Sequence, residues 1–216
     1  MKEDRRQETN AGASTAILLA AGAGRRMGED KLLLDYRGRP LILHPLAALS
    51  KSAGVRKTVV VVRPGFGLPP LPPGGPPVQM VENPFHEQGM GSSLRAGVAA
   101  SPVDTEAFVI VLADMPLVGP RLIEEVLGAW RRSRRPIAAP VFQGRRGHPV
   151  VVSASLRESL LACSGDQGLR GLIREHPELV CEVETADPGC VFDVDTPQDL
   201  SREEVGAGPG DWEAMK

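Results

Sequence analysis

Alternating strand-like and helix-like segments predict a three-layer α/β/α fold, in which helices cover both faces of a mostly parallel sheet. Three short apolar segments, at 16–20 (AILLA), 58–62 (TVVVV) and 108–112 (FVIVL), have the composition of buried parallel strands. Sheets of this kind bind ligands beyond the carboxyl ends of their strands. The sequence therefore directs attention to the residues that follow 16–20, 58–62 and 108–112.

Helices are predicted between and after these strands. The clearest pattern lies at 121–131, where Leu122, Ile123, Val126, Leu127 and Trp130 recur at helical spacing. Further helices are expected at 41–52, 91–100, 153–162, 168–175 and 197–204.

The segment at 64–77 (PGFGLPPLPPGGPP) contains seven prolines and four glycines. Such a segment cannot form a central strand or a helix, so we expect a semi-rigid connection across the surface. The alternative is a binding segment for a module that recognises proline.

Length and composition indicate one domain at 15–205, between a flexible leader at 1–14 and a flexible tail at 206–216. A formal net charge of -2 lacks the basic excess typical of nucleic-acid-binding proteins. No apolar run reaches the roughly 20 residues that cross a bilayer. Three cysteines, an odd number without a C-x-x-C pair, favour a reducing compartment. We therefore expect a soluble cytoplasmic protein that binds neither nucleic acid nor membrane.

A glycine-rich turn with basic residues follows the first predicted strand, at 21–31 (AGAGRRMGEDK). Small residues allow a ligand to approach the backbone, whose N–H groups can surround phosphate oxygens. Met27 occupies the position where a dinucleotide-binding G-x-G-x-x-G motif needs its third glycine, and Glu29 stands where a Walker motif needs lysine. The turn thus predicts a phosphate site of another kind; the alternative is a tight strand-to-helix turn with arginines facing solvent.

Acidic residues occur at two predicted strand ends. Asp114 follows 108–112 directly, where a carboxylate can hold a hard cation such as Mg2+. A cap for the next helix is the alternative, but that helix is expected to begin near Pro120, too far away. At 193–195, strand alternation would put Asp193 and Asp195 on one side, and either Asp195 or Thr196 could cap the helix that follows.

Six segments, in order along the chain, resemble the motifs of the MobA-like NTP transferases, the relatives of molybdenum cofactor cytidylyltransferase. The segments are LAAGAGRRMGEDK (19–31), ENPFHEQGMGSSLRAG (82–97), ADMP (113–116), GHPV (147–150), GDQGLR (165–170) and DVDTPQDL (193–200). The resemblance covers about 16–200 and implies a Rossmann-like fold of the nucleotide-diphospho-sugar transferase type.

The resemblance also implies a role for each matching residue. Arg26, Lys31 and Asp114 would be catalytic, and Mg2+ would be held by Asp114 and Asp193. The implied nucleotide-binding set is Leu19, Ala20, Ala21, Gly22, Gly24, Arg26, Lys31, Gly91, Ser92, Ser93 and Asp114. The implied acceptor-binding set is His148, Pro149, Asp166 and Arg170.

Several of these residues have structural alternatives. Ser92 and Ser93 could simply open a helix. His148 could be a surface turn residue, and Asp166 with Arg170 could be a surface pair at helical spacing.

Within the family that the chain resembles, LAAG and GMGSSL are typical of cytidylyl members. The resemblance therefore implies transfer of CMP from CTP to a phosphorylated acceptor, molybdopterin, with release of pyrophosphate and with a molybdoenzyme as recipient of the product. Use of GTP or of another small phosphate remains open. Two further alternatives are a non-catalytic cofactor-binding chaperone and an NADP-dependent oxidoreductase, in which Arg63 would contact a 2′-phosphate.

Overall fold

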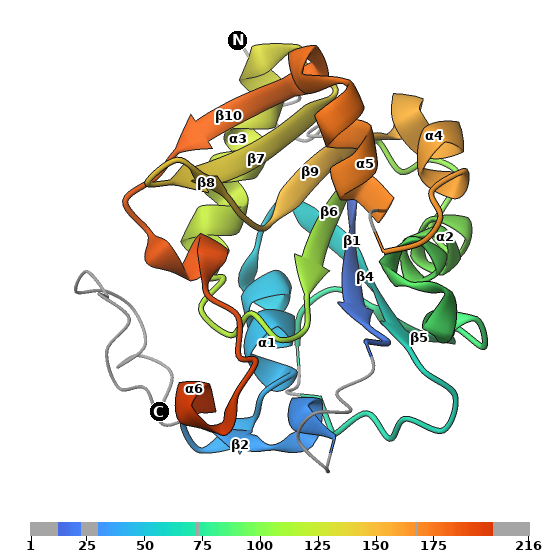
Figure 1. The fold of residues 1–216 in the computed structure, drawn as a ribbon, viewed down its shortest axis with the longest axis vertical. Helices are drawn as coiled ribbons and strands as arrows, with labels where there is room; N and C mark the ends of the chain where they lie inside the picture. The colour runs from blue at the N-terminus through green and yellow to red at the C-terminus, as the bar shows by residue number, and fades with distance from the viewer. Residues whose placement is uncertain (1–12, 23–29, 72–73, 167, 201–216) are drawn as a thin grey trace, which may run out of the picture.

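A mixed sheet organises the residues that the computed structural model describes, which are 13–22, 30–71, 74–166 and 168–200 (Figure 1). Eight strands lie in the order β10-β7-β9-β6-β1-β4-β5, with β8 paired to β7. The strands are β1 (Ser14–Ala20), β4 (Val55–Val62), β5 (Val78–Glu82), β6 (Ala107–Leu112), β7 (Ile137–Phe142), β8 (Arg145–Arg146), β9 (Val150–Ser153) and β10 (Val180–Glu184). β1 pairs in parallel with β4 and β6, β4 with β5, and β7 with β10. β9 runs antiparallel to β6 and β7, so the predicted mostly parallel sheet is confirmed.

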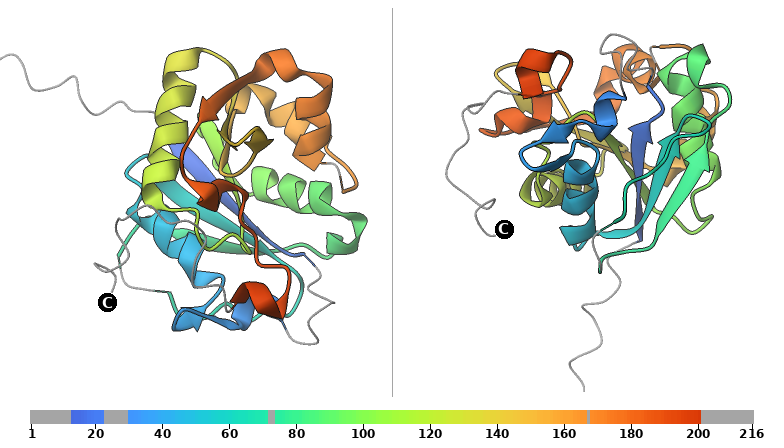
Figure 2. Two further views of the ribbon diagram at one scale, coloured as in Figure 1. Left: turned by 60° about the vertical axis from the view of Figure 1, so that its left-hand side comes forward. Right: turned by 90° about the horizontal axis from the view of Figure 1, so that it is seen from below.

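Helices cover both faces of the sheet (Figure 2). The helices are α1 (Leu43–Lys51), α2 (Met90–Ala99), α3 (Pro120–Ser133), α4 (Arg157–Leu161), α5 (Gly168–Glu175) and α6 (Pro197–Leu200). Apolar residues of α1 and α3 join the core on one face, and those of α2, α4 and α5 join it on the other. The three-layer prediction is therefore confirmed.

Short elements complete the chain between these helices and strands. Five 3-10 turns among the described residues are η1 (Lys31–Leu33), η2 (His86–Gln88), η3 (Ala154–Leu156), η4 (Pro177–Leu179) and η5 (Pro188–Val191). A two-stranded hairpin, β2 (Asp35–Tyr36) and β3 (Arg39–Pro40), lies outside the main sheet. None of the described helices is long and apolar enough to span a membrane.

The central strand β1 shows how the sheet divides the core. Its side chains alternate between the two faces, because successive residues of a strand point in opposite directions. Ala16, Leu18 and Ala20 pack with α1 and α3, whereas Ile17 and Leu19 pack with α2 and α5. All seven residues of β1 are buried, as expected of a strand with a helical layer on each side.

The predicted helices exist, with two changes of extent. The segment at 153–162 forms η3 and then the short α4. The last predicted helix, 197–204, is described only as α6, and 201–204 lie outside the described residues. The predicted leader and tail also lie there, except that Ser14 begins β1.

The proline-rich segment connects two neighbouring parallel strands, β4 and β5. Parallel neighbours need a crossover of about a dozen residues, which is usually a helix. Here the loop at 63–77 makes the crossover, and Gly75 contacts the end of α1, where a Cβ atom would come within 2.8 Å of Ser50 Cβ. Of the two expectations for this segment, the described part fits the long connection.

Candidate active site

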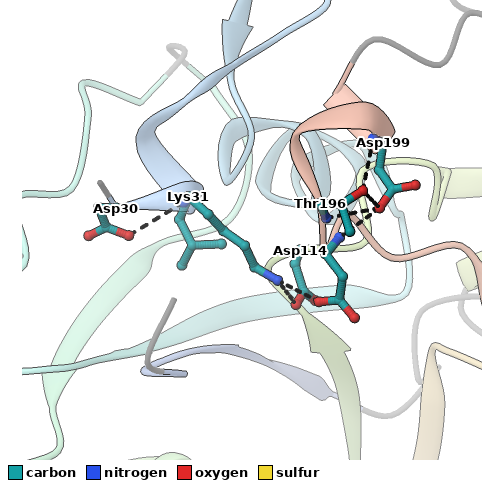
Figure 3. A network of polar contacts seen from close by, with 7 residues as sticks. Asp30, Lys31, Asp114, Thr196 and Asp199 are labelled. Carbon is teal, nitrogen blue, oxygen red and sulfur yellow. Dashed lines mark hydrogen bonds and ion pairs between the residues drawn. The ribbon is translucent and has the colours of Figure 1, made fainter. Parts of the chain in front are cut away.

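Lys31 and Asp114 meet at the carboxyl edge of the sheet. Asp114 comes two residues after β6, and Lys31 begins η1 beyond the glycine-rich turn that follows β1. Because β1 and β6 are parallel neighbours, both segments leave the same edge of the sheet. Lys31 Nζ donates to Asp114 Oδ2 at 2.8 Å, and Figure 3 shows the lysine side chain reaching across to the carboxylate. The structure thus unites two residues that the sequence predicted to be catalytic.

Asp195 is the second carboxylate on Lys31, at 3.0 Å from Nζ. Sequence analysis favoured Asp193 as the partner of Asp114. The predicted alternation holds, since Val194 is buried while Asp193 and Asp195 are exposed. Val194 N donates to Asp114 O at 2.9 Å and anchors this segment beside β6. In the structure Asp114 and Asp195 share Lys31, and Asp193 is close enough to both carboxylates to feel their charge. The predicted metal pair of Asp114 and Asp193 stays a prediction.

We call Lys31, Asp114, Asp193 and Asp195 the carboxylate cluster. Burial raises the pKa of Asp193, and the neighbouring carboxylates of Asp195 and Asp114 raise it further. For Lys31, burial alone would lower the pKa, but the carboxylates of Asp114 and Asp195 outweigh burial and leave its pKa above the ordinary value. Negative charge is thus concentrated here, and within the carboxylate cluster the Lys31 ammonium offsets only part of it.

The carboxylate cluster has the oxygen donors that Mg2+ or Mn2+ prefers. The described residues hold no group of three or more His, Cys, Asp or Glu side chains arranged for a metal ion. Asp114 and Asp195 nevertheless direct one oxygen each at a single cation, the Lys31 ammonium. Two carboxylates suit a magnesium ion that takes its other ligands from water and phosphate. The residues present therefore fit a divalent metal that arrives with a phosphate ligand.

Thr196 and Asp199 cap the start of α6 and fix the backbone of Asp195, the last residue of the carboxylate cluster (Figure 3). Thr196 Oγ1 donates to Asp199 Oδ2 at 2.7 Å and accepts from Asp199 N at 3.3 Å. Asp199 Oδ2 also accepts from the backbone N–H of Asp195 at 3.2 Å. The capping residue is therefore Thr196, which leaves the Asp195 carboxylate for Lys31.

The predicted phosphate turn is described only at its two ends. Ala20 and Ala21 are buried, and Gly22 is exposed with open space where a Cβ atom would stand. Gly24 and Arg26 lie outside the described residues. At the far end, Asp30 accepts from Leu32 N and from Arg63 Nη2, the latter at 2.6 Å.

Asn83, which sequence analysis missed, organises the turn that contains Ser92 and Ser93. Its Nδ2 donates to both serine hydroxyls, at 2.9 and 3.1 Å, and its Oδ1 accepts from Phe85 N at 3.0 Å. All three polar residues are at most 5% exposed. The hydroxyls therefore hold the start of α2 from inside, and their contact with base or ribose stays a prediction. A polar residue directly after β5, at the ligand edge, is the signal that could have identified Asn83.

Glycines allow the start of α2 to touch the loop at 164–168. Gly91 N donates to Gly165 O at 2.9 Å, and a Cβ atom on Gly91 would come within 2.8 Å of Ser164. Gly89, at φ 91°, lies so close to Asp166 that a Cβ atom would meet its Oδ1 at 2.5 Å. Gly91 and Asp166 therefore join two predicted motifs, one for the nucleotide and one for the acceptor. Among the described residues, Asp166 and Arg170 form no ion pair with each other.

A cavity of about 350 Å3 is lined by residues of the sheet and of α5, and its His148 is close enough to Asp114 to feel the carboxylate's charge. Leu19 and Ile110 contribute to it from β1 and β6, and Leu169 and Ile173 contribute from α5. Its polar residues are Arg146, His148, Arg170 and Arg174. We call it the arginine cavity. Leu19, predicted to contact the nucleotide, lines this cavity, whereas Pro149 is buried behind His148 and does not line it.

The positive charge of the arginine cavity comes from two helical residues at i and i+4. Arg170 and Arg174 have no ion-pair partner in the described part of the chain, while Arg146 pairs with Glu182. Burial lowers the pKa of His148, a hydrogen bond from its Nδ1 to Ile110 O opposes this, and Arg170 lowers the pKa further. Burial thus favours the neutral form of His148, which lines the cavity and does not stand on a surface turn.

These features are those of an α/β protein that binds a polyphosphate at a sheet edge. The family model of the MobA-like NTP transferase domain matches residues 16–180. The chain belongs to the MobA-like NTP transferase family, and nucleotidyl transfer is the class of activity that the family supports.

Relatives carry three different activities in their names. Nicotine blue oxidoreductase of Paenarthrobacter nicotinovorans is 32% identical over 90% of this chain and 98% of its own. A probable molybdenum cofactor guanylyltransferase of Thermococcus kodakarensis is 28% identical over 86% of this chain and 91% of its own. A 2-C-methyl-D-erythritol 4-phosphate cytidylyltransferase of Cereibacter sphaeroides is 30% identical over 73% of this chain and 72% of its own.

A solved structure supports the fold. Rv0371C of Mycobacterium tuberculosis in complex with manganese superposes with a TM-score of 0.67 and is 23% identical. The match covers 88% of this chain and 96% of that one.

Proposed function

We propose that the chain is a magnesium-dependent cytidylyltransferase that transfers CMP from CTP to a phosphorylated acceptor, molybdopterin, and releases pyrophosphate. The observation that carries the proposal is the meeting of Lys31, Asp114 and Asp195 at the carboxyl edge of β1 and β6, with His148 of the arginine cavity within electrostatic reach of Asp114. A polyphosphate on the first group and an acceptor in the second would be neighbours. Three cysteines without disulfide partners support a reducing, cytoplasmic setting.

The reaction would be a direct displacement at phosphorus. An oxygen of the acceptor phosphate forms the new bond to the α-phosphorus, and the bond from that phosphorus to the bridging oxygen of the β-phosphate breaks, so pyrophosphate leaves with the electron pair. A bound magnesium ion would supply electrostatic stabilisation of the charge that develops. Lys31, and Arg26 on the predicted phosphate turn, would neutralise the leaving pyrophosphate. No cysteine or serine nucleophile is required.

The arginine cavity supports a phosphorylated acceptor with an apolar body. Arg170 and Arg174 offer two guanidinium groups, which bind phosphate in bidentate geometry. The apolar side chains of Leu94, Ile110 and Ile173 form walls against which a planar ring can pack. Neutral His148 can exchange a hydrogen bond with such a ring without adding charge. A molybdoenzyme would then receive the product.

The choice of base rests on Ala21 and on the GMGSSL segment at 89–94, both typical of cytidylyl members of the family. Relatives of both base specificities match this chain at similar identity. GTP is therefore the competing donor in the experiment.

The relative named nicotine blue oxidoreductase motivates a second candidate function, reduction by a dinucleotide cofactor. Arg63 follows β4 and could contact a 2′-phosphate. Its guanidinium is already bound to Asp30 at 2.6 Å and lies 5.7 Å from the ring centre of Phe66. The carboxylate cluster suits a divalent metal that carries a polyphosphate, which the transferase reaction needs and hydride transfer from a dinucleotide does not.

The decisive experiment combines binding and turnover on the purified full chain. Thermal melting with Mg2+ and each of ATP, GTP, CTP, UTP and NADPH is followed by pyrophosphate release with molybdopterin as acceptor. A ligand that binds the native state raises the melting temperature with its concentration and affinity. A magnesium-dependent shift with CTP, and pyrophosphate release that requires molybdopterin, are the expected results.

Each other outcome selects an alternative. A shift with GTP alone would correct the base, and a shift with NADPH alone would favour the oxidoreductase. Binding of CTP without pyrophosphate release would indicate a cofactor-binding chaperone. Pyrophosphate release only with another phosphate would correct the acceptor.

A further inference from the structure

Lys31 stands where a divalent cation would have to bind. Its ammonium nitrogen lies 2.8 Å from Asp114 Oδ2 and 3.0 Å from Asp195 Oδ1. A magnesium ion held by the same two residues would need these oxygens at about 2.0–2.1 Å. The lysine and the metal therefore compete for the same oxygen lone pairs.

The competition is strong because the lysine is enclosed. Its side chain is 14% exposed and that of Asp114 is 25% exposed, so water screens this ion pair less than it would screen a surface pair. Asp195, at 60% exposure, is the more open partner. Removing the lysine would leave the carboxylates of Asp114 and Asp195 without the ammonium that they share, which favours binding of another cation.

We infer that Lys31 acts as an internal counterion that keeps divalent metal off Asp114 and Asp195 until a nucleotide polyphosphate draws its ammonium away. A triphosphate gives Lys31 a partner with more negative charge than either carboxylate. Once the ammonium turns to the phosphate, the oxygens of Asp114 and Asp195 become available. Metal and nucleotide then bind with positive coupling, and each raises the affinity of the other by the same factor.

The inference deepens the proposed function, on which its nucleotide step rests, but its central consequence needs no nucleotide. Replacing Lys31 with a neutral residue removes the competitor and leaves every carboxylate in place. The nucleotide-free variant should therefore bind divalent metal more tightly than the wild-type protein. An ordinary phosphate-binding lysine with no hold on the carboxylates would leave this affinity unchanged.

The test titrates the nucleotide-free full chain with Mn2+ and follows the six-line electron paramagnetic resonance signal of the free ion. We expect Lys31→Gln and Lys31→Met to lower the Mn2+ Kd by about tenfold, which corresponds to about 1.4 kcal/mol. Lys31→Arg keeps the charge and should stay close to wild type. Lys51→Gln removes the same charge from the exposed end of α1 and should change nothing.

A double variant tests whether the gain arises at these carboxylates. Lys31→Gln combined with Asp195→Asn should return the Mn2+ affinity to the wild-type value or below. A gain that survives Asp195→Asn would place the new metal site elsewhere and overturn the inference. Folded Lys31→Gln or Lys31→Met protein with wild-type Mn2+ affinity would overturn it too.

A nucleotide arm uses only wild-type protein, so it does not depend on the folding of any variant. Mn2+ affinity should rise at least about tenfold in the presence of a slowly hydrolysed CTP analogue, after correction for the Mn2+ that the analogue binds in solution. Equal affinities with and without the bound analogue contradict the inference. If no nucleotide binds at all, the proposed function fails, while the nucleotide-free comparison of Lys31 variants still decides the counterion role.

Discussion

The carboxylate cluster and the arginine cavity handle their charges in opposite ways, although the two are linked through His148, which lines the cavity and whose pKa the charge of Asp114 raises. In the carboxylate cluster, Lys31 already binds Asp114 and Asp195. In the arginine cavity, Arg170 and Arg174 lack ion-pair partners among the described residues and stand over apolar walls. The carboxylate cluster must break the ion pairs of Lys31 before its carboxylates can bind another cation. The arginine cavity can accept an anion without breaking an ion pair of Arg170 or Arg174. If the proposed function holds, ligand binding at the carboxylate cluster therefore requires an exchange of partners by Lys31, whereas binding in the arginine cavity requires no such exchange.

Asp114→Asn should give the largest effect, because it removes one of the two carboxylates that meet at Lys31. We expect the rate of pyrophosphate release to fall by about 10³-fold, with the fold intact. Asp104→Asn, the same substitution on an exposed loop, serves as the control and should retain activity. An Asp114→Asn enzyme of normal turnover would remove the carboxylate cluster from the mechanism.

Arg170→Gln tests the other side of the comparison. Loss of one guanidinium should raise the KM for the phosphorylated acceptor about tenfold, since charge-assisted hydrogen bonds contribute about 1.5–3 kcal/mol. The melting shift produced by nucleotide should stay the same. Arg56→Gln, at an exposed position in β4, controls for the change in net charge. A variant that loses nucleotide affinity and keeps its acceptor KM would show that Arg170 contacts the nucleotide and not the acceptor.

Asn83→Ala tests whether Asn83 holds the start of α2, where Ser92 and Ser93 are predicted to contact the nucleotide. The substitution leaves the buried hydroxyls of Ser92 and Ser93 without the donor that holds them. The free energy of unfolding should fall by about 2 kcal/mol in urea titrations, and the KM for nucleotide should rise while that for acceptor changes little. If the KM for nucleotide and the KM for acceptor rise equally, the start of α2 positions both binding sites and not the nucleotide site alone.

His44→Gln should give the smallest effect, and only at acid pH. Burial lowers the pKa of His44 to about 4, below the ordinary 6.5. Its Nε2 lies 2.7 Å from Tyr36 O and its Nδ1 lies 3.1 Å from Arg39 Nη2, contacts that suit a neutral ring. Between about pH 4 and 6.5 the unfolded chain binds the extra proton, so stability falls as the pH falls through this window.

Urea unfolding at pH 7 and pH 5 checks this prediction. The wild-type protein should lose about 1–2 kcal/mol more than the variant between these values, because the variant has no ring to protonate. Since the hairpin of β2 and β3 follows η1, acid should loosen the neighbourhood of Lys31. An identical pH dependence in both proteins would exclude His44 as the cause.

Several structural features could be predicted from the sequence because they depend on local patterns. Apolar runs identified β1, β4 and β6, and helical spacing identified α1, α2, α3 and α5. The positions of Lys31 and Asp114 followed from one rule, since both come after parallel strands whose carboxyl ends share an edge. Strands β5 and β10 were missed because they alternate or are largely exposed and carry no long apolar run. Strands β7 and β9 were also missed, although they are mostly buried, because a proline interrupts the first and the second has only four residues.

The sequence by itself determined the class of fold, the family resemblance and the residue types at the sheet edge. Only the tertiary structure decided which residues meet. It put Asp195 on Lys31, turned Ser92 and Ser93 inward to Asn83, and gathered Arg146, Arg170 and His148 around one cavity. The physical reason is that a sequence pattern reports the periodicity of one segment, whereas these contacts join residues from segments far apart in the chain. Their partners are chosen by how the segments pack on the sheet.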